Sequence, residues 1–363
     1  MFNKKSIVFL LPEYYETPIG GYKVVFEYSN RLVADGHSVT IVYPYFIYFL
    51  ESSIKRKLKM CFFFFYYLFF KRKGVTGWFP LNKNVTTRFV FSLSEKKIPK
   101  ADIYIATAME TAVFLNNYKF IDKKNKYYLI QALEDWQWGT ETALSTWKLQ
   151  LNKIVISPWL QNIAKSLDEE TVLIENGVDR KNIKLCIPYE KKDKFTVMML
   201  YHKQKLKGCD DGLEALLKLK AKYTLLNSIW FGCPDRPLNL PDWIEYYKLP
   251  DESLLNELYN KSGIFIGTSY SEGFGLTIGE AMSCGCAVAC TDAGGYLTMA
   301  KHRETALVSE KGNVQTLVNS VGELIENDKL RLEIAKNGYE FIQQFTWDIA
   351  YGKFTKFLIE NKN

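Results

Sequence analysis

The sequence is poor in histidine, has no closely paired cysteines, and lacks an apolar run long enough to cross a bilayer. Among 363 residues there are three histidines, and the seven cysteines form no C-x-x-C pair. An odd number of such cysteines is typical of reduced cytosolic thiols. Cys284, Cys286 and Cys290 lie close together with no histidine near them. We therefore interpret these cysteines as small packed side chains, and we expect no zinc site.

The longest apolar run covers residues 60–70, within the segment KRKLKMCFFFFYYLFFKRK at 55–73. A helix of that length reaches roughly 16 Å, about half the hydrocarbon thickness of a bilayer, so it cannot span a membrane. Aromatic residues flanked by cations are typical of a segment that lies on an anionic membrane surface. A buried helix with solvated lysines is the alternative. We expect a cytoplasmic protein that contacts the inner leaflet of the membrane through residues 55–73.

Acidic residues are scarce in one part of the chain. The net charge is +7, and residues 51–100 hold twelve Lys or Arg against two Glu. Such a patch suits an anionic membrane surface or a nucleic acid. A nucleic-acid site would have basic residues spread along a groove, with isolated aromatic residues that stack on bases. An unbroken aromatic block between cations does not fit that pattern, so no nucleic-acid partner is expected.

Short apolar runs alternate with helical patterns along the chain. The segments 6–12 and 38–44 are predicted strands, and 22–36 between them is a predicted helix that ends at Gly36. Further strands are predicted at 86–91, 102–106, 127–131, 153–157, 197–202, 228–232, 263–269 and 287–292, and further helices at 208–220, 251–260, 275–284, 313–326 and 328–345. This alternation indicates parallel sheets covered by helices, with ligands beyond the carboxyl ends of the strands. The length and the polar segment 186–196 indicate two domains.

The stretch SEGFGLTIGEAMSCGCAVAC at 271–290 carries the chemistry. Glu280 is the only charged residue between positions 273 and 290, in a segment otherwise suited to a core. A carboxylate there must meet hydrogen-bond donors. Glu272 stands eight residues earlier, and the predicted helix opens with unpaired amides at about Gly275–Thr277, which suit a phosphate. Two carboxylates around a phosphate site fit a nucleotide-sugar.

Glu272 and Glu280, within E-G-F-G-L-x-x-x-E-A-M, resemble the signature of the retaining glycosyltransferases of family 4. Other motifs agree in order along nearly the whole chain: Gly20-Gly21, Gly36-His37, Asn176-Gly177-Val178-Asp179, Lys207-Gly208, Gly294-Gly295 and FTWD at 345–348. The resemblance implies the α/β GT-B fold, with two Rossmann-like doubly wound domains that face each other across a cleft. It implies an acceptor-binding domain at 1–188 and a nucleotide-sugar domain at 189–345. It also implies that the last helix, 346–363, packs back on the first domain.

By the same resemblance, Glu280 would hold the ribose of the donor and Glu272 its sugar. The amides of Gly275, Leu276 and Thr277 would hold the distal phosphate, and Lys207 would neutralise the departing diphosphate. The family usually has an arginine where this chain has His202, with Lys203 beside it, and a lysine lacks the planar fork of arginine. The remaining expected donor contacts are Phe274, Leu249, Gly20 and Gly21.

The expected acceptor residues follow the predicted strand at 127–131 or lie in the loop EYYETPIGG at 13–21. Gln131, Glu134 and Asp135 could bind acceptor hydroxyls, or the two acids could cap the next helix. Tyr14 is expected to contact a sugar, and packing is its alternative. Many family members have a histidine near the level of Gln131, where this chain has acidic and amide groups.

The resemblance implies transfer of a hexosyl group with retention, without a metal or another cofactor, and the sequence contains no D-x-D motif. The chain is also similar to rhamnosyl-type members that build bacterial surface polysaccharides such as O-antigen. The expected acceptor is a saccharide or a polyprenyl-linked saccharide. The alternatives are a sugar-nucleotide epimerase of the same shape, a phosphorylase with pyridoxal phosphate on a lysine, and a non-enzymatic basic protein of the membrane surface.

Overall fold

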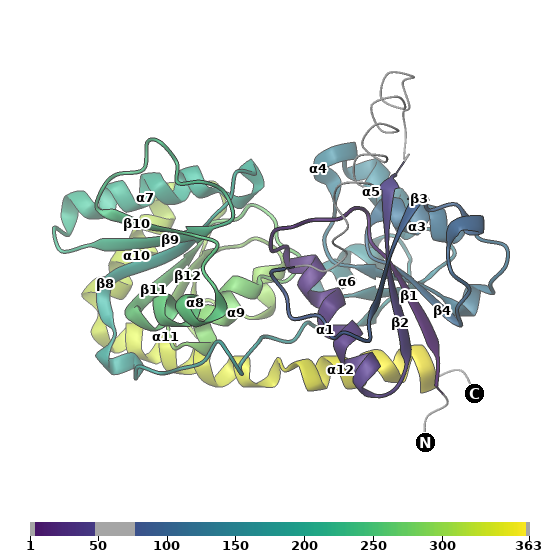
Figure 1. Ribbon diagram of the computed structural model, residues 1–363. Coiled ribbons are helices and arrows are strands. Elements are labelled where there is room, and N and C mark those ends of the chain that lie inside the picture. Colours follow the sequence, from purple (N-terminus) through teal and green to yellow (C-terminus); the bar gives the residue numbers. More distant parts are fainter. Residues whose placement is uncertain (1–3, 48–76, 361–363) are drawn as a thin grey trace. The chain divides into compact units, whose positions relative to one another are not determined.

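The computed structural model describes residues 4–47 and 77–360 (Figure 1). The aromatic segment 55–73 lies outside these residues. The chain divides into two compact units. The first comprises residues 1–156, 160–174 and 351–363, and the second comprises residues 157–159 and 175–350. Among the described helices, none is long and apolar enough to cross a membrane.

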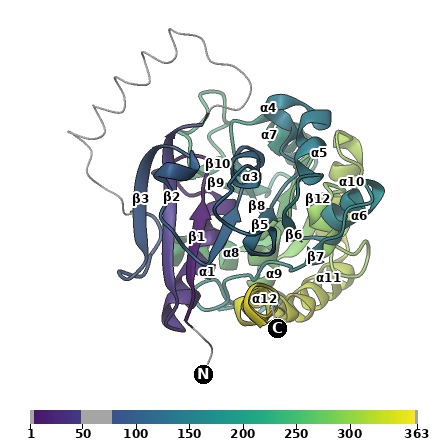
Figure 2. The ribbon, with the colours of Figure 1, turned by 90° about the vertical axis from the view of Figure 1, so that its right-hand side faces the viewer.

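The first unit is built on a parallel sheet of seven strands. Their order is β3-β2-β1-β4-β5-β6-β7. Figure 2 labels β3, β2 and β1 toward one side of this unit and β5, β6 and β7 toward the other. The strands are β1 (Ser6–Leu10), β2 (Ser38–Phe46), β3 (Thr86–Ser92), β4 (Ile103–Ala106), β5 (Lys126–Ile130), β6 (Asn152–Val155) and β7 (Val172–Leu173). The central strands β4 and β5 are buried along their whole length, as expected for a sheet covered on both faces.

The helices of the first unit connect these strands. They are α1 (Gly20–Ala34), α3 (Met109–Asn116), α4 (Asp135–Trp138), α5 (Thr140–Trp147) and α6 (Pro158–Ser166). The final helix α12 (Trp347–Thr355) follows the second unit and belongs to the first unit from Tyr351 onward. The ring of Phe354 stacks on Tyr28 of α1, with ring centroids 4.0 Å apart, and lies beside Phe9 of β1. The hydroxyl of Tyr351 donates to Asp35 at 2.6 Å. These contacts hold the end of α12 against the first unit.

The second unit repeats the same strand order in six parallel strands, β10-β9-β8-β11-β12-β13. These strands are β8 (Asp193–Tyr201), β9 (Asn227–Gly232), β10 (Ile244–Lys248), β11 (Ser262–Gly267), β12 (Ala287–Thr291) and β13 (Leu307–Ser309). Its helices are α7 (Cys209–Lys222), α8 (Glu252–Lys261), α9 (Leu276–Ser283), α10 (Val314–Glu326) and α11 (Asp328–Phe341). Helices α7 and α10 lie along one face of the sheet, and α8 and α9 lie along the other (Figure 1).

Both units therefore have the doubly wound α/β arrangement, and the predicted fold class is confirmed. In each unit the chain direction across the sheet reverses between two neighbouring strands: β1 and β4 in the first, β8 and β11 in the second. Ligands of such sheets bind beyond the carboxyl ends of these strands. A ligand is therefore expected at the loops that follow these four strands.

Two features of the second unit differ from the sequence prediction. Strands β10 and β13 were not predicted, because β10 mixes polar and aromatic residues at the edge of the sheet and β13 has three residues. The unit begins at residue 175 instead of 189. The reason is that residues 177 and 178 pack against the end of the second unit. The amide of Val178 donates to the carbonyl of Phe345 at 2.9 Å, and a Cβ on Gly177 would lie 2.3 Å from the backbone nitrogen of Trp347. The predicted linker also overlaps β8, which starts at Asp193.

Candidate active site

Glu272 and Lys207 meet at the reversal point of the second sheet. Glu272 lies in the loop after β11, and Lys207 lies in the loop after β8. The Nζ of Lys207 is 2.6 Å from Oε1 of Glu272, and Ser269 Oγ donates to the same oxygen at 2.7 Å. The Glu272 side chain is 15% exposed. Its Oε2 accepts no hydrogen bond from any residue that the structure describes, so it can accept one from a ligand hydroxyl.

The loop of Glu272 is fixed by its backbone and by a buried tyrosine. The amide of Glu272 donates to Ala293 at 3.0 Å, and its carbonyl accepts from Gly295 at 2.9 Å. The hydroxyl of Tyr296 contacts Ser269 Oγ at 3.2 Å and thereby orients the serine toward Glu272. The sequence motif did not reveal Ser269 and Tyr296, because their roles depend on the neighbouring loops in space.

Two glycines are required by their backbone conformations. Gly275 has φ of 92°, and a Cβ there would lie 2.4 Å from the ring of Tyr296. Gly208 has φ of 60°, and its Cβ would lie 2.0 Å from the carbonyl oxygen of Thr268. Because side chains cannot be accommodated, these glycines set the start of α9 and the position of Lys207.

Helix α9 carries the second acid. Its first amides have no partner within the helix, so Leu276 and Thr277 can donate to an anion at its amino end. Glu280 is 6% exposed, and its Oε2 accepts from the hydroxyl of Tyr259 at 3.1 Å. Burial and the charge of Glu280 raise the pKa of Tyr259 far above its usual value, so this hydroxyl keeps its proton. The sequence did not indicate Tyr259.

His202 lies at the end of β8, near this ion pair. Its Nδ1 accepts from the amide of Gln204 at 3.0 Å, so the neutral ring presents a proton on Nε2. Burial, with Lys207 nearby, lowers its pKa, and Glu272 opposes this in part. His202 can therefore donate one hydrogen bond as a neutral group, whereas Lys203 is exposed.

Phe274 and Leu249 are the two other residues of this unit that the sequence predicts to contact the donor. The Phe274 side chain is 3% exposed and packs edge-on against Phe345, so it fills the interior and leaves only its backbone for a ligand. Leu249 follows β10, is 42% exposed, and has φ of 49°. Its amide donates to Gly232 at 2.8 Å, which holds the residue at the carboxyl end of β9.

The expected acceptor residues lie at the carboxyl edge of the first sheet. Gln131 follows β5, and its Nε2 donates to the carbonyl of Gly21 at 3.2 Å, in the first turn of α1. Glu134 does not cap its own helix: its Oε2 accepts from the amide of Met109, at the start of α3, at 2.6 Å. The structure thus brings Gln131, Gly21 and Glu134 to one edge.

The other predicted site residues of the first unit are Tyr14, Asp135 and Gly20. Tyr14 packs edge-on against Tyr43 and Phe89, with centroids 5.4 Å apart in both pairs, in agreement with the packing alternative. Asp135 is the first residue of α4, and its carboxylate accepts from the hydroxyl of Thr140 at 3.3 Å. Gly20 is exposed at the first position of α1.

No group of three or more metal-binding side chains is arranged to hold a metal ion within residues 4–47 and 77–360. Cys284, Cys286 and Cys290 are each at most 1% exposed. The thiols of Cys286 and Cys284 contact backbone carbonyl oxygens, namely Tyr259 at 3.1 Å and Lys184 at 3.6 Å. These three cysteines are small buried side chains.

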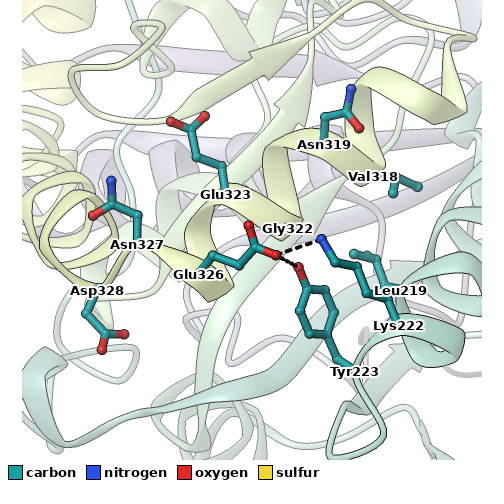
Figure 3. A pocket seen from close by; sticks show the side chains of 10 residues that line it. All are labelled: Leu219, Lys222, Tyr223, Val318, Asn319, Gly322, Glu323, Glu326, Asn327 and Asp328. Carbon is teal, nitrogen blue, oxygen red and sulfur yellow. Dashed lines mark hydrogen bonds and ion pairs between the residues drawn. The ribbon is translucent and has the colours of Figure 1, made fainter.

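A surface pocket of about 660 Å³ lies elsewhere in the second unit, between the ends of α7 and α10 (Figure 3). Glu326 accepts there from Lys222 and from Tyr223, both at 2.6 Å. Lys222 and Tyr223 precede β9, so the pocket is at the amino edge of the sheet, away from the loops that hold Glu272. Glu323 pairs with Arg303 and Asp328 with Lys194, both outside the pocket. The pocket does not contribute to the candidate site.

The match to a known protein family lies within the second unit. The family described as glycosyl transferases group 1 matches residues 187–341. This region contains Lys207, Glu272 and Glu280. Residues 187–341 are therefore similar in sequence to glycosyl transferases group 1.

The whole chain has a close structural counterpart. HepE from Anabaena, solved in complex with UDP-glucose, superposes with a TM-score of 0.70 over 98% of this chain and 99% of that one, at 16% identity. The chain has the GT-B fold. Likeness at this identity establishes the fold alone.

Curated relatives align with the chain over part of their length. An uncharacterized glycosyltransferase of Methanocaldococcus jannaschii, MJ1178, is 25% identical over 54% of this chain and 55% of that protein. The N,N'-diacetylbacillosaminyl-diphospho-undecaprenol alpha-1,3-N-acetylgalactosaminyltransferase of Campylobacter jejuni is 25% identical over 54% of this chain and 56% of that protein. The chain thus spans about half the length of these relatives.

Proposed function

We propose that this GT-B chain is a glycosyltransferase that moves a hexosyl group from a nucleoside-diphosphate sugar to a saccharide or a lipid-linked saccharide. The observation that carries the proposal is the placement of Lys207, Glu272 and Glu280 around the amino end of α9. An ion pair of 2.6 Å and a buried carboxylate flank amides that can bind phosphate. The match of this region to glycosyl transferases group 1 and the UDP-glucose in the HepE structure support a nucleotide-sugar donor.

In this proposal each group has a chemical task. Glu280 would accept hydrogen bonds from the ribose, and Oε2 of Glu272 would accept one from the donor sugar. The amides at the start of α9 and the ammonium of Lys207 would stabilise the charge that develops on the departing diphosphate. Neutral His202 would add a hydrogen bond from Nε2. We further propose retention at the anomeric carbon and no requirement for a metal, on the resemblance to family 4.

The name of the Campylobacter relative includes an undecaprenol-linked acceptor, which supports a polyprenyl-linked saccharide as acceptor for this chain. We propose a rhamnosyl donor on sequence similarity alone.

We also propose that residues 55–73 contact the inner leaflet of the cytoplasmic membrane. Deletion of residues 58–72 should abolish sedimentation with anionic vesicles while donor binding persists. Unchanged sedimentation would reject the membrane contact.

A sugar-nucleotide screen tests the function. Because a ligand that binds the folded state raises the apparent melting temperature, one sugar nucleotide should stabilise the purified chain. Glu280→Gln should weaken that ligand about 10- to 100-fold, since a hydrogen bond to a charged group contributes about 1.5–3 kcal/mol. Glu214→Gln is the matched control, because Glu214 is exposed on α7 and pairs with Lys218.

Turnover separates the proposal from its rivals. A glycosyltransferase consumes donor in the presence of an acceptor glycoside and forms a glycosidic product, whereas an epimerase converts the donor without any acceptor. Glu272→Gln should abolish the transfer. Nuclear magnetic resonance of the product reports the anomeric configuration, and an inverted product would refute retention. No stabilisation by any sugar nucleotide would refute the proposed function.

A further inference from the structure

Polar side chains gather at the carboxyl edge of the first sheet, outside the site described for the second unit. We name as the carboxyl-edge cluster the residues Glu13, Tyr22, Tyr43, Glu110 and Glu134. They come from consecutive positions across the sheet order β2-β1-β4-β5: Tyr43 from β2, Glu13 from the loop after β1, Glu110 from the helix after β4 and Glu134 from the loop after β5. The cluster thus surrounds the reversal point of this sheet, where ligands of such folds bind.

Glu110 is the centre of this cluster. It lies in the first turn of α3, and its negative charge raises the pKa of Glu13 on one side and of Glu134 on the other, in each case adding to the effect of burial. The indole Nε1 of Trp138 donates to Oε1 of Glu110 at 3.4 Å. Two carboxyl groups from loops and one from the first turn of α3 therefore share one electrostatic environment.

Glu134 acts in this environment as a neutral acid. Burial is the main cause that raises its pKa to about 8, although the amide of Met109, 2.6 Å away, opposes the shift. The hydroxyl of Tyr128 is also hydrogen-bonded to Glu134. The cluster therefore combines a buried carboxyl group whose pKa is raised to about 8 with Glu110, which accepts from Trp138.

Two buried polar atoms at this edge lack partners among the described residues. Tyr43 is 1% exposed, and its hydroxyl makes no hydrogen bond. It lies near enough to Tyr22 to raise the pKa of that residue, and the hydroxyl of Tyr22 donates to the carbonyl of Glu13 at 2.6 Å. The second atom is Oε1 of Gln131, whose Nε2 is bound to Gly21. Buried polar atoms without partners are costly, so a ligand with several hydroxyl groups would satisfy them.

The charge of the cluster limits which ligand can bind. A second negative charge placed about 5 Å from a carboxylate is strongly repelled at the effective dielectric of a protein surface. A hydroxyl group or an ammonium group is not repelled.

We propose that the carboxyl-edge cluster binds the acceptor as a hexose or hexosamine ring without an acidic group, and that Glu110 sets this selectivity. The inference rests on the proposed function, because it assigns to the acceptor a ring that the cluster would hold while the second unit holds the donor. Glu110 and Glu13 were not among the residues expected from the sequence.

Three glycosides that share ring stereochemistry test the inference: the methyl glycosides of glucose, glucosamine and glucuronic acid. Their binding to the full chain can be measured at neutral pH by saturation-transfer nuclear magnetic resonance. We expect the first two to bind and the glucuronide to bind at least tenfold more weakly. Glu110→Gln should bring the glucuronide to within about threefold of the glucoside, because the variant keeps an acceptor for Trp138 but removes the charge.

Glu170→Gln is the matched control, since Glu170 is exposed in the same unit and its replacement changes the net charge equally. A melting temperature close to that of the wild type shows that Glu110→Gln is folded. Equal binding of glucoside and glucuronide in the wild type would overturn the inference, and so would undiminished discrimination in Glu110→Gln or no glycoside binding at all. Donor stabilisation of the same samples separates the two proposals: its absence refutes the proposed function even when the glycosides discriminate as expected.

Discussion

Glu134 keeps a proton at neutral pH, and Glu134→Gln should remove a pH-dependent cost of folding. Burial raises its pKa to about 8, and Glu110 adds to the shift. In the unfolded chain the usual value is 4.5. Between these values the folded protein holds a proton that the unfolded chain has released. The stabilising contribution of that proton is complete below the unfolded pKa and is lost as the pH rises through the folded pKa.

The magnitude follows from this difference. The unfolding free energy of the wild type should fall, relative to Glu134→Gln, by about 1.4 kcal/mol for each pH unit between the two pKa values. The upper bound over the whole interval is about 5 kcal/mol, and the partial exposure of Glu134 reduces our expectation to about 3 kcal/mol. Glutamine preserves the acceptor for the amide of Met109, so the variant should differ mainly in charge.

Urea unfolding of both proteins, followed by tryptophan fluorescence from about pH 5 to about pH 8, measures the difference. Glu141→Gln serves as the matched control, because Glu141 is exposed in the neighbouring helix α5. A difference between wild type and Glu134→Gln that does not change with pH would refute the reasoning, and so would a difference of opposite slope.

Three further predictions concern the second unit. Lys192→Met should lower the unfolding free energy by about 3 kcal/mol. The reason is that the buried Nζ of Lys192 donates to the carbonyls of Tyr259 at 2.7 Å and Asn260 at 3.0 Å. Lys191→Met, at an exposed position, is the control in the same thermal-unfolding experiment. Gly295→Ala should abolish the stabilisation of the chain by the donor, because its Cβ would lie 2.3 Å from the carbonyl carbon of Gly273. Gly352→Ala is the control and should keep this stabilisation, since its Cβ meets nothing within 4 Å. Equal donor binding by both variants would contradict this prediction. Because the pKa of His202 is lowered, the folded protein binds a proton at that ring less readily than the unfolded chain does. The unfolding free energy of the wild type should therefore fall relative to that of His202→Gln as the pH drops below about 6.5. His302→Gln is the control and should show the same pH dependence as the wild type.

The sequence predicted the fold and much of the candidate site of the second unit because the informative residues are close together along the chain. Glu272, Gly275 and Glu280 lie within nine residues, so the loop and the helix that hold them are local. Lys207 was predicted from the resemblance. Its 2.6 Å ion pair with Glu272 depends on β8 and β11 being neighbours in the sheet, which a single sequence does not state.

The carboxyl-edge cluster was only partly predictable for the same reason. The position of Glu134 before a helix indicates a possible cap for that helix, but its carboxyl group accepts from the amide of Met109, 25 residues earlier in the chain. Glu110 and Glu13 join it only because β1, β4 and β5 are adjacent. Strand order brings these acids together, and neither periodicity nor spacing encodes that order.

A crystal structure of the chain with a bound nucleoside diphosphate tests the central claim most directly. The account predicts the distal phosphate against the amides of Gly275–Thr277, the ribose hydroxyls on Glu280, and Lys207 beside the phosphate. A nucleotide bound at another place, with Glu272 and Glu280 held only by Lys207, Ser269 and Tyr259, would contradict it.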